Sequence, residues 1–172
     1  MHFRQRTWRI APFGLALLTP SLLGTVGTVP SFHDRVLASQ NHERATLGIR
    51  PLRWSGALAD DAQSWASYLA DTGQFRHAPA YLREGAGENL WAGTRGAYRA
   101  EEMVDAWARE KRHFSPGPFP SDERSIAAVG HYTQIVWRKS HAVGCAFARG
   151  RRMDVLVCRY QNAGNVRGER PF

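Results

Sequence analysis

The strongest constraint on the fold is the segment VGCAFARGRRMDVLVCRY at residues 143–160, which contains both cysteines of the chain. Its two ends are apolar, whereas its middle is polar and contains a glycine, a pattern typical of a β-hairpin. A turn centred on Arg151 and Arg152 places Cys145 and Cys158 opposite each other on the two strands. In an oxidising compartment an even number of cysteines favours a disulfide, which stabilises a loop of this length by about 3 kcal/mol. Two free buried thiols are the alternative.

The N-terminus has the pattern of an export signal. Three arginines, at positions 4, 6 and 9, precede a run without charged residues from Ile10 to Phe32 that contains APFGLALLTPSLLGTVG. We predict that residues 1–31 are a signal peptide, with cleavage after Gly27 or Ser31. The alternative is an uncleaved anchor, but a membrane span needs about 20 apolar residues and this run is interrupted by Pro12, Pro20 and several glycines. We therefore expect a secreted, extracellular protein, or a periplasmic one in a bacterium.

Residues 32–172 are predicted to form a single domain, long enough to bury a core without further support. The net charge of +8 permits contact with anionic polymers or lipid head groups. The basic residues are scattered, however, and a solvated surface explains them equally well. Because no nucleic-acid-binding motif accompanies the charge, we expect no nucleic-acid partner. We expect a monomer.

Helices are predicted early in this domain and strands mostly late. Apolar spacing and capping residues indicate helices over 32–47, 55–73 and 97–114, the last followed by a loop over 115–125. Shorter apolar runs at GENLWAG, VGCAFA and DVLVCRY indicate strands. This mixture of helices and strands is typical of an α+β fold.

Two glutamates have sequence neighbours that suggest burial. Met103, Trp107 and Glu110 fall on one stripe of the third helix, so that Glu110 shares the core-facing side. A carboxylate there must be paired, protonated or bound to a metal, because burying it alone is costly; the alternative is that Glu110 extends to water near the end of the helix. Glu88 stands between a glycine-rich loop and the apolar pair Leu90–Trp91. A lone glutamate in such a loop is more often exposed.

Two histidines could complete a site with these glutamates. His77 follows the second helix, and His131 precedes the apolar run YTQIVW. Each alone is more often a structural residue than a ligand. Together with Glu88 and Glu110, however, they form a coherent hypothesis. Two imidazoles can bind Zn²⁺ or a similar ion through nitrogen, and two carboxylates can orient the imidazoles or move protons from a bound water.

Several blocks of the sequence resemble the CAP superfamily, which groups cysteine-rich secretory proteins, insect venom antigen 5 and plant pathogenesis-related proteins of group 1. GHYTQIVWRKSHAVGCA and VCRYQNAGNVRGERPF resemble its two signature motifs, and PLRWSGALADDAQSWA, GENLW and WAREK match its other blocks in order. The resemblance extends from about Leu37 to Phe172. One departure lies in the first helix, where Gln40 replaces the usual histidine before Asn41.

The resemblance implies an α-β-α sandwich with a central antiparallel sheet, the CAP or SCP fold. It also implies a cavity with two histidines and two glutamates, which by motif fall on His77, Glu88, Glu110 and His131. In the family the histidines can bind a divalent metal, often zinc, with the glutamates alongside. GHYTQIVW is then expected to form a short helix rather than a strand.

The resemblance favours an exported protein whose cavity binds a divalent metal, with His77 and His131 as ligands, and a small hydrophobic ligand such as a sterol or lipid, or a membrane surface. One alternative is a metal-dependent hydrolase, in which Glu88 or Glu110 acts as general base on a metal-bound water. We rank it lower because no oxyanion hole or substrate-positioning set is recognisable. The other is a non-catalytic protein of envelope interaction, antimicrobial action or defence.

Overall fold

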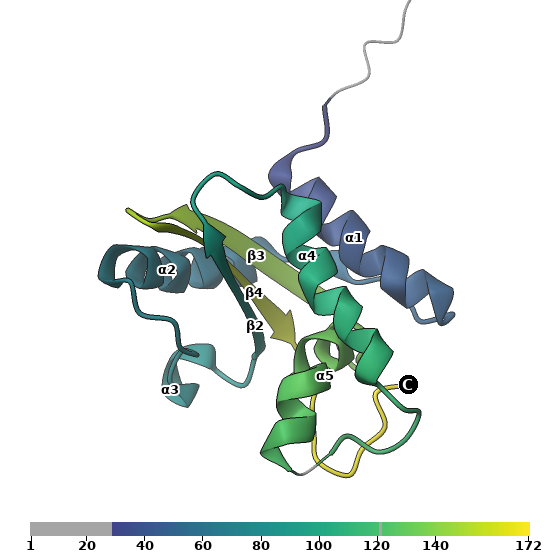
Figure 1. The fold of residues 1–172 in the computed structure, drawn as a ribbon. Coiled ribbons are helices and arrows are strands. Elements are labelled where there is room, and N and C mark those ends of the chain that lie inside the picture. Colours follow the sequence, from purple (N-terminus) through teal and green to yellow (C-terminus); the bar gives the residue numbers. More distant parts are fainter. Residues whose placement is uncertain (1–28, 121) are drawn as a thin grey trace, which may run out of the picture.

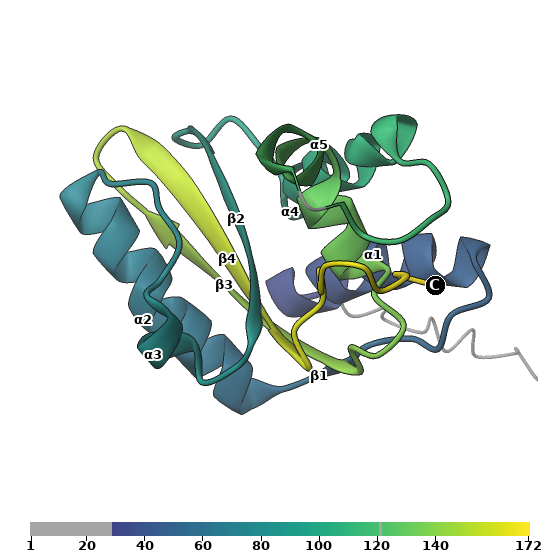
Figure 2. The same ribbon diagram turned by 90° about the horizontal axis from the view of Figure 1, so that it is seen from below.

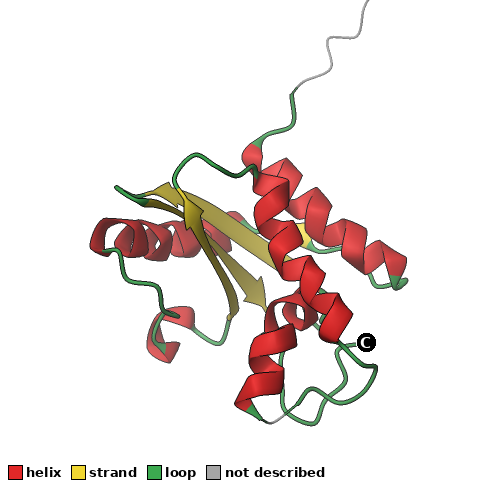
Figure 3. Ribbon diagram, viewed as in Figure 1, coloured by secondary structure: helices red, strands yellow, loops and turns green. Residues whose placement is uncertain are grey.

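A sheet of four strands lies between two layers of helices in the computed structural model, which describes residues 29–120 and 122–172 (Figure 1). One long helix covers one face of the sheet, and three others cover the opposite face (Figures 2 and 3). This arrangement confirms the predicted α+β class and the three-layer α-β-α sandwich. The predicted signal peptide falls almost wholly on residues 1–28, outside the described residues. No helix in the described part is both long and apolar enough to cross a membrane.

The first two helices begin and end within one residue of the predicted bounds. Helix α1, Phe32–Thr46, starts at a capping box in which the Ser31 and Asp34 side chains each accept a hydrogen bond from the other residue's backbone N–H. Helix α2, Gly56–Thr72, is capped by Ser55. It ends at Gly73, whose φ of 69° lies in the left-handed region that glycine adopts without strain.

The remaining helices differ in detail from the prediction. The third predicted helix is α4, Ala100–Ala108, which continues as a 3₁₀ turn, η1, over Arg109–His113. Helix α5, Glu123–Ile135, includes HYTQI as the resemblance implied. It begins inside the predicted loop 115–125, because the side chain of Asp122 accepts a hydrogen bond from the Ser125 N–H and caps it. The short helix α3, Ala80–Arg83, was not predicted.

The predicted hairpin forms the centre of the sheet. Strands β3, Ala142–Arg149, and β4, Met153–Gln161, pair antiparallel with Cys145 opposite Cys158, and the two cysteines form a disulfide. The alternative of two free thiols is therefore wrong. Strand β2, Gly87–Thr94, pairs antiparallel with β4. The short β1, Arg53–Trp54, joins β3 in parallel and gives the order β1-β3-β4-β2.

Alternation along the strands separates two cores. On the face under α2, Val155 and Val157 of β4 pack with Leu90 of β2. On the opposite face, Leu156 and Tyr160 pack against α1, α4 and α5. Glu88 and Arg159 lie on the same face of the sheet as Val155 and Val157, under α2. Asn89, the next residue of β2, lies on the opposite face. The two faces of β2 thus carry different polar groups at its first residues.

Candidate functional site

The first polar pair joins the loop after α2 to the beginning of β2. Nδ1 of His77 lies 2.6 Å from Oε1 of Glu88, and the same oxygen accepts a hydrogen bond of 3.0 Å from the backbone N–H of Ala78. The Glu88 side chain is fully buried, whereas that of His77 is 57% exposed. The carboxylate is therefore the fixed member of this pair, and the imidazole extends from it toward solvent.

Arg159 holds the other oxygen of the same carboxylate. It stands opposite Glu88 in the β2–β4 register, and its Nη2 lies 3.1 Å from Glu88 Oε2. Its side chain is 2% exposed, and no hydrogen-bond partner for its Nε or Nη1 occurs among the described residues. Burial lowers the pKa of Arg159, and the charge of Glu88 opposes that shift.

Arg159 was not among the predicted site residues. The alternation of side chains along β4 could have indicated it, because Val155, Val157 and Arg159 lie on one face of the strand. An arginine on such a buried face needs an acid as its partner. Glu88 is that acid.

The second polar pair joins η1 to α5. Oε1 of Glu110 lies 2.6 Å from Nδ1 of His131. Oε2 accepts hydrogen bonds of 2.9 and 3.1 Å from the backbone N–H groups of His131 and Tyr132. The side chains are 33% exposed for His131 and 18% for Glu110. Glu110 thus lies against α5 rather than extending into water.

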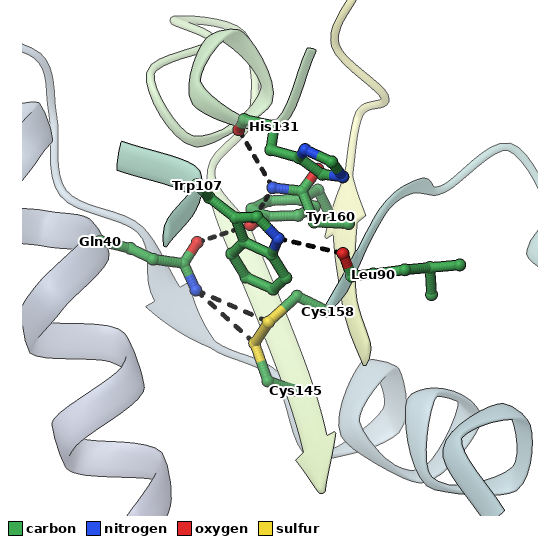
Figure 4. Close-up of a disulfide and its surroundings, with 8 residues drawn as sticks. Gln40, Leu90, Trp107, His131, Cys145, Cys158 and Tyr160 are labelled. Carbon is green, nitrogen blue, oxygen red and sulfur yellow. Dashed lines mark hydrogen bonds between the residues drawn. A yellow bond between two sulfur atoms is a disulfide. The ribbon is translucent and has the colours of Figure 1, made fainter. Parts of the chain in front are cut away.

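The core holds the imidazole of His131 in place. Its ring stacks on the indole of Trp107 with centroids 5.8 Å apart and planes 16° apart. Trp107 in turn donates a hydrogen bond from Nε1 to the carbonyl oxygen of Leu90, 3.0 Å away (Figure 4). In this pair the histidine is packed on the core and its ring still reaches the surface.

A buried hydrogen-bond chain connects His131 to the disulfide (Figure 4). The Asn89 amide donates to the His131 carbonyl oxygen at 3.0 Å and to the Tyr160 hydroxyl at 3.2 Å. That hydroxyl donates to Oε1 of Gln40 at 2.7 Å, and Nε2 of Gln40 lies 3.6 and 3.8 Å from the two sulfur atoms. Burial strongly raises the pKa of Tyr160, so its hydroxyl keeps the proton that it donates. The residue that departs from the family pattern, Gln40, therefore has a structural partner.

The arrangement can orient two imidazoles. Each Nδ1 faces a carboxylate, and no hydrogen bond to either Nε2 occurs in the described part of the chain. A carboxylate on one ring nitrogen is the arrangement that orients histidines toward metals. However, no group of three or more His, Cys, Asp or Glu side chains in ranges 29–120 and 122–172 is placed to hold a metal ion. The structure thus brings the four predicted residues together as two separate pairs.

Comparisons with a family model and with known proteins agree on the same group of relatives. Residues 37–160 match the sequence model of the CAP, or cysteine-rich secretory protein, family. Pathogenesis-related protein 1A of Nicotiana tabacum is 35% identical over 137 residues, which are 79% of this chain and 78% of that protein. Pathogenesis-related protein PRMS of Zea mays is 31% identical over 140 residues, 79% of this chain and 80% of that protein.

Solved structures share the fold. The crystal structure of NaASP2 with Zn²⁺ aligns with a TM-score of 0.73 at 21% identity and covers 86% of this chain and 88% of that one. The structure of BmVAL-1 aligns with a TM-score of 0.68 at 24% identity, covering 87% and 85%. At these identities the likeness concerns the fold alone.

Proposed function

The chain belongs to the CAP family, the cysteine-rich secretory proteins, and from this membership we propose that it is an exported CAP-domain protein in which His77 and His131 bind a divalent metal ion. Glu88 and Glu110 orient these ligands. Export is supported by the charge pattern of residues 1–31 and by a disulfide between Cys145 and Cys158, a bond typical of oxidising compartments.

One observation carries the metal proposal: each imidazole has a carboxylate on Nδ1 at 2.6 Å and directs the other nitrogen away from it. This hydrogen bond fixes the tautomer in which Nε2 is the metal-binding atom. Zn²⁺ suits two such nitrogens, and water molecules would complete its coordination. When bound by His77 and His131, the ion would supply Lewis-acid chemistry. Because two protein ligands are fewer than the three or four of most zinc sites, we expect modest affinity.

Zinc titration by calorimetry tests this proposal. We expect the wild-type protein to bind Zn²⁺ and the His77→Ala/His131→Ala double variant to lose the binding heat. The matched control is His42→Ala/His113→Ala, which removes two exposed histidines outside the pairs. Equal heats for wild type and the His77/His131 variant would reject the metal site. Equal losses in both variants would indicate adventitious binding to surface histidines.

The hydrolase alternative requires a carboxylate with a free acceptor oxygen for the proton of water. Oε1 of Glu88 lies beside His77 Nδ1 and accepts from the Ala78 N–H, and Oε2 is buried in an ion pair with Arg159 although it accepts no hydrogen bond from the described residues. Both oxygens of Glu110 face donors. These contacts favour an orienting role over a general-base role. A peptide-hydrolysis screen tests the alternative, with Glu110→Gln as the variant that loses turnover if that residue is the base.

Lipid binding is a second candidate, favoured by a hollow of about 430 Å³ beside η1 and α5. Its walls include Phe114, Pro118, Pro120, Ala128 and Val129. His113, Ser115, Arg124 and Ser125 complete the lining. A hollow of this size with several apolar walls accommodates part of a sterol or an acyl chain. Binding of a fluorescent sterol should weaken in Ala128→Trp, which fills the hollow, and persist in the control Ala57→Trp, placed on the exposed part of α2. Unchanged binding in Ala128→Trp would exclude this hollow.

A further inference from the structure

A hollow of about 870 Å³ is lined by basic and neutral residues alone. Its lining residues belong to the segment that follows α1, as far as β1, and to the segment between α5 and β3. Its lining residues are Gly48, Ile49, Arg50, Pro51, Arg53, Arg138, Lys139, Ser140 and His141. Five of these can carry positive charge and none is acidic. The hollow contains none of the four His and Glu residues discussed above.

A single buried side chain holds both walls of the hollow. Arg44, fully buried, donates from Nε to the carbonyl oxygen of Arg50 at 2.8 Å. From its two other nitrogens it donates to the carbonyl oxygens of Ile135, Trp137 and Ser140 at 2.8 to 2.9 Å. Two of these acceptors, Arg50 and Ser140, line the hollow, one from each wall, so Arg44 links the two walls through their backbone. The cationic side chains of the hollow therefore stand on a backbone that Arg44 holds in place.

The walls are fixed further by the strand ends and by Asn162. The N–H of Arg53 donates to the His141 carbonyl oxygen at 3.0 Å, which joins the two walls directly. The Asn162 amide donates to the Lys139 carbonyl oxygen at 3.2 Å and lies 3.3 Å from His141 Nδ1. Since the backbone is already ordered, binding a ligand here requires little further loss of conformational freedom.

Most of the positive charge at this hollow is not neutralised by the protein. Lys139 forms an ion pair of 2.7 Å with Glu169. In the described part of the chain, no ion pair is formed by Arg50, Arg53 or Arg138. Another hollow, at the β3–β4 turn, differs in this respect, because Asp71 lines it together with Arg151 and Arg152.

We propose that this hollow is a binding site for a phosphate-bearing anion, held by the guanidinium groups of Arg50, Arg53 and Arg138. Guanidinium groups bind phosphate oxygens through paired charge-assisted hydrogen bonds, and three of them around one concavity can surround a single phosphate. Free phosphate compounds and phospholipid head groups share this chemistry. A general basic surface would bind anions equally at any pair of exposed arginines. Variants at two different pairs of arginines therefore distinguish a specific phosphate site from such a surface.

The test measures binding of two probes to the full domain. Calorimetry with inorganic pyrophosphate reports a free phosphate ligand. Co-sedimentation with vesicles of phosphatidylglycerol and phosphatidylcholine, compared with phosphatidylcholine alone, reports a head group. We expect Arg50→Gln/Arg138→Gln to weaken the binding about tenfold or more, the loss expected for one or two charge-assisted hydrogen bonds. Both substitutions leave intact the backbone groups that contact Arg44 and Pro171.

The matched control is Arg151→Gln/Arg152→Gln, which removes the same charge from the hollow that contains an acid. We expect it to change the binding less than twofold. The site is supported if a probe binds and only Arg50→Gln/Arg138→Gln weakens that binding. The probe that binds then shows whether the ligand is a free phosphate compound or a phospholipid head group. Equal weakening in both variants, or no binding of either probe, would overturn the proposal. Circular dichroism melting of each variant verifies that the fold persists. Zinc calorimetry is independent of this result, because the hollow shares no residue with the two His–Glu pairs.

Discussion

The two His–Glu pairs contain the same chemical groups but differ in how deeply the acid is buried and in what holds the imidazole. In the His77–Glu88 pair the carboxylate is fully buried and the imidazole is 57% exposed. In the His131–Glu110 pair the imidazole stacks on Trp107, and the carboxylate retains some contact with solvent. In both pairs the carboxylate is more buried than the imidazole, but only Glu88 is fully buried and paired with a buried arginine. Substitutions at the two glutamates should have different consequences for the fold even if both pairs orient a metal ligand.

The largest expected difference concerns the two acids. Replacing Glu88 with Leu leaves the guanidinium of Arg159 buried without a partner, and breaking a buried pair in this way costs about 3–5 kcal/mol of unfolding free energy. Replacing Glu110 with Leu removes hydrogen bonds from a partly exposed group and should cost about 1–3 kcal/mol. Urea unfolding of both variants measures the two values.

A double variant controls for the change of shape at Glu88. Glu88→Leu/Arg159→Leu removes both charges, so it should recover most of the stability lost by Glu88→Leu alone. Similar losses for Glu88→Leu and Glu110→Leu, with no recovery in the double variant, would contradict the distinction between the two pairs.

The second prediction concerns the disulfide, which contacts the network of only one pair. Replacing Cys145 and Cys158 with Ala should lower the unfolding free energy by about 3 kcal/mol, because the unfolded chain is no longer cross-linked. It also removes the sulfur atoms beside the Gln40 amide. We therefore expect the imidazole NMR signals of His131 to shift while those of His77 stay in place. Equal shifts at both histidines, or none, would show that the disulfide does not act through this network.

Much of the fold could be predicted because local signals and packing agree. Ser31, Ser55 and Gly73 delimit two helices, and the hairpin pattern alone predicted the pairing of Cys145 with Cys158. The two-residue strand β1 and the four-residue helix α3 were missed because neither is long enough to show a periodic pattern.

The sequence indicated the four residues of the two His–Glu pairs, but not which side chains each of them contacts. Helical spacing placed Glu110 beside Trp107, and the family motifs indicated His77, Glu88 and His131. The partner of Glu88 depends on the β2–β4 register, which places Arg159 opposite it across the sheet. Register between distant strands cannot be read from either strand alone, so the difference between the two pairs emerges only in the folded chain.

The smallest expected loss of unfolding free energy concerns the ion pair between Arg35 and Glu101, which is partly exposed. It serves as a reference for the buried Glu88–Arg159 contact. Arg35 of α1 binds both carboxylate oxygens of Glu101 of α4, with the Nε to Oε1 distance at 2.6 Å. The two side chains are 34% and 39% exposed. Water and salt screen such a pair, so Glu101→Gln should cost at most about 1 kcal/mol, well below the loss expected for Glu88→Leu.

The pH dependence of this reference pair has a definite sign. The hydrogen bonds from Arg35 lower the pKa of Glu101 to about 2, from an ordinary value of 4.5. Its contribution to stability is therefore complete above pH 4.5 and disappears as the pH falls through 2, where the carboxylate is protonated in both states. Urea unfolding of wild type and Glu101→Gln, from pH 7 downward, measures this contribution. The difference in unfolding free energy between the two proteins should shrink as the pH falls. Other acids with lowered pKa values are common to both and cancel. A difference that stays constant down to pH 2 would mean that Glu101 stabilises the fold through its shape rather than its charge, and the pair would no longer serve as an electrostatic reference.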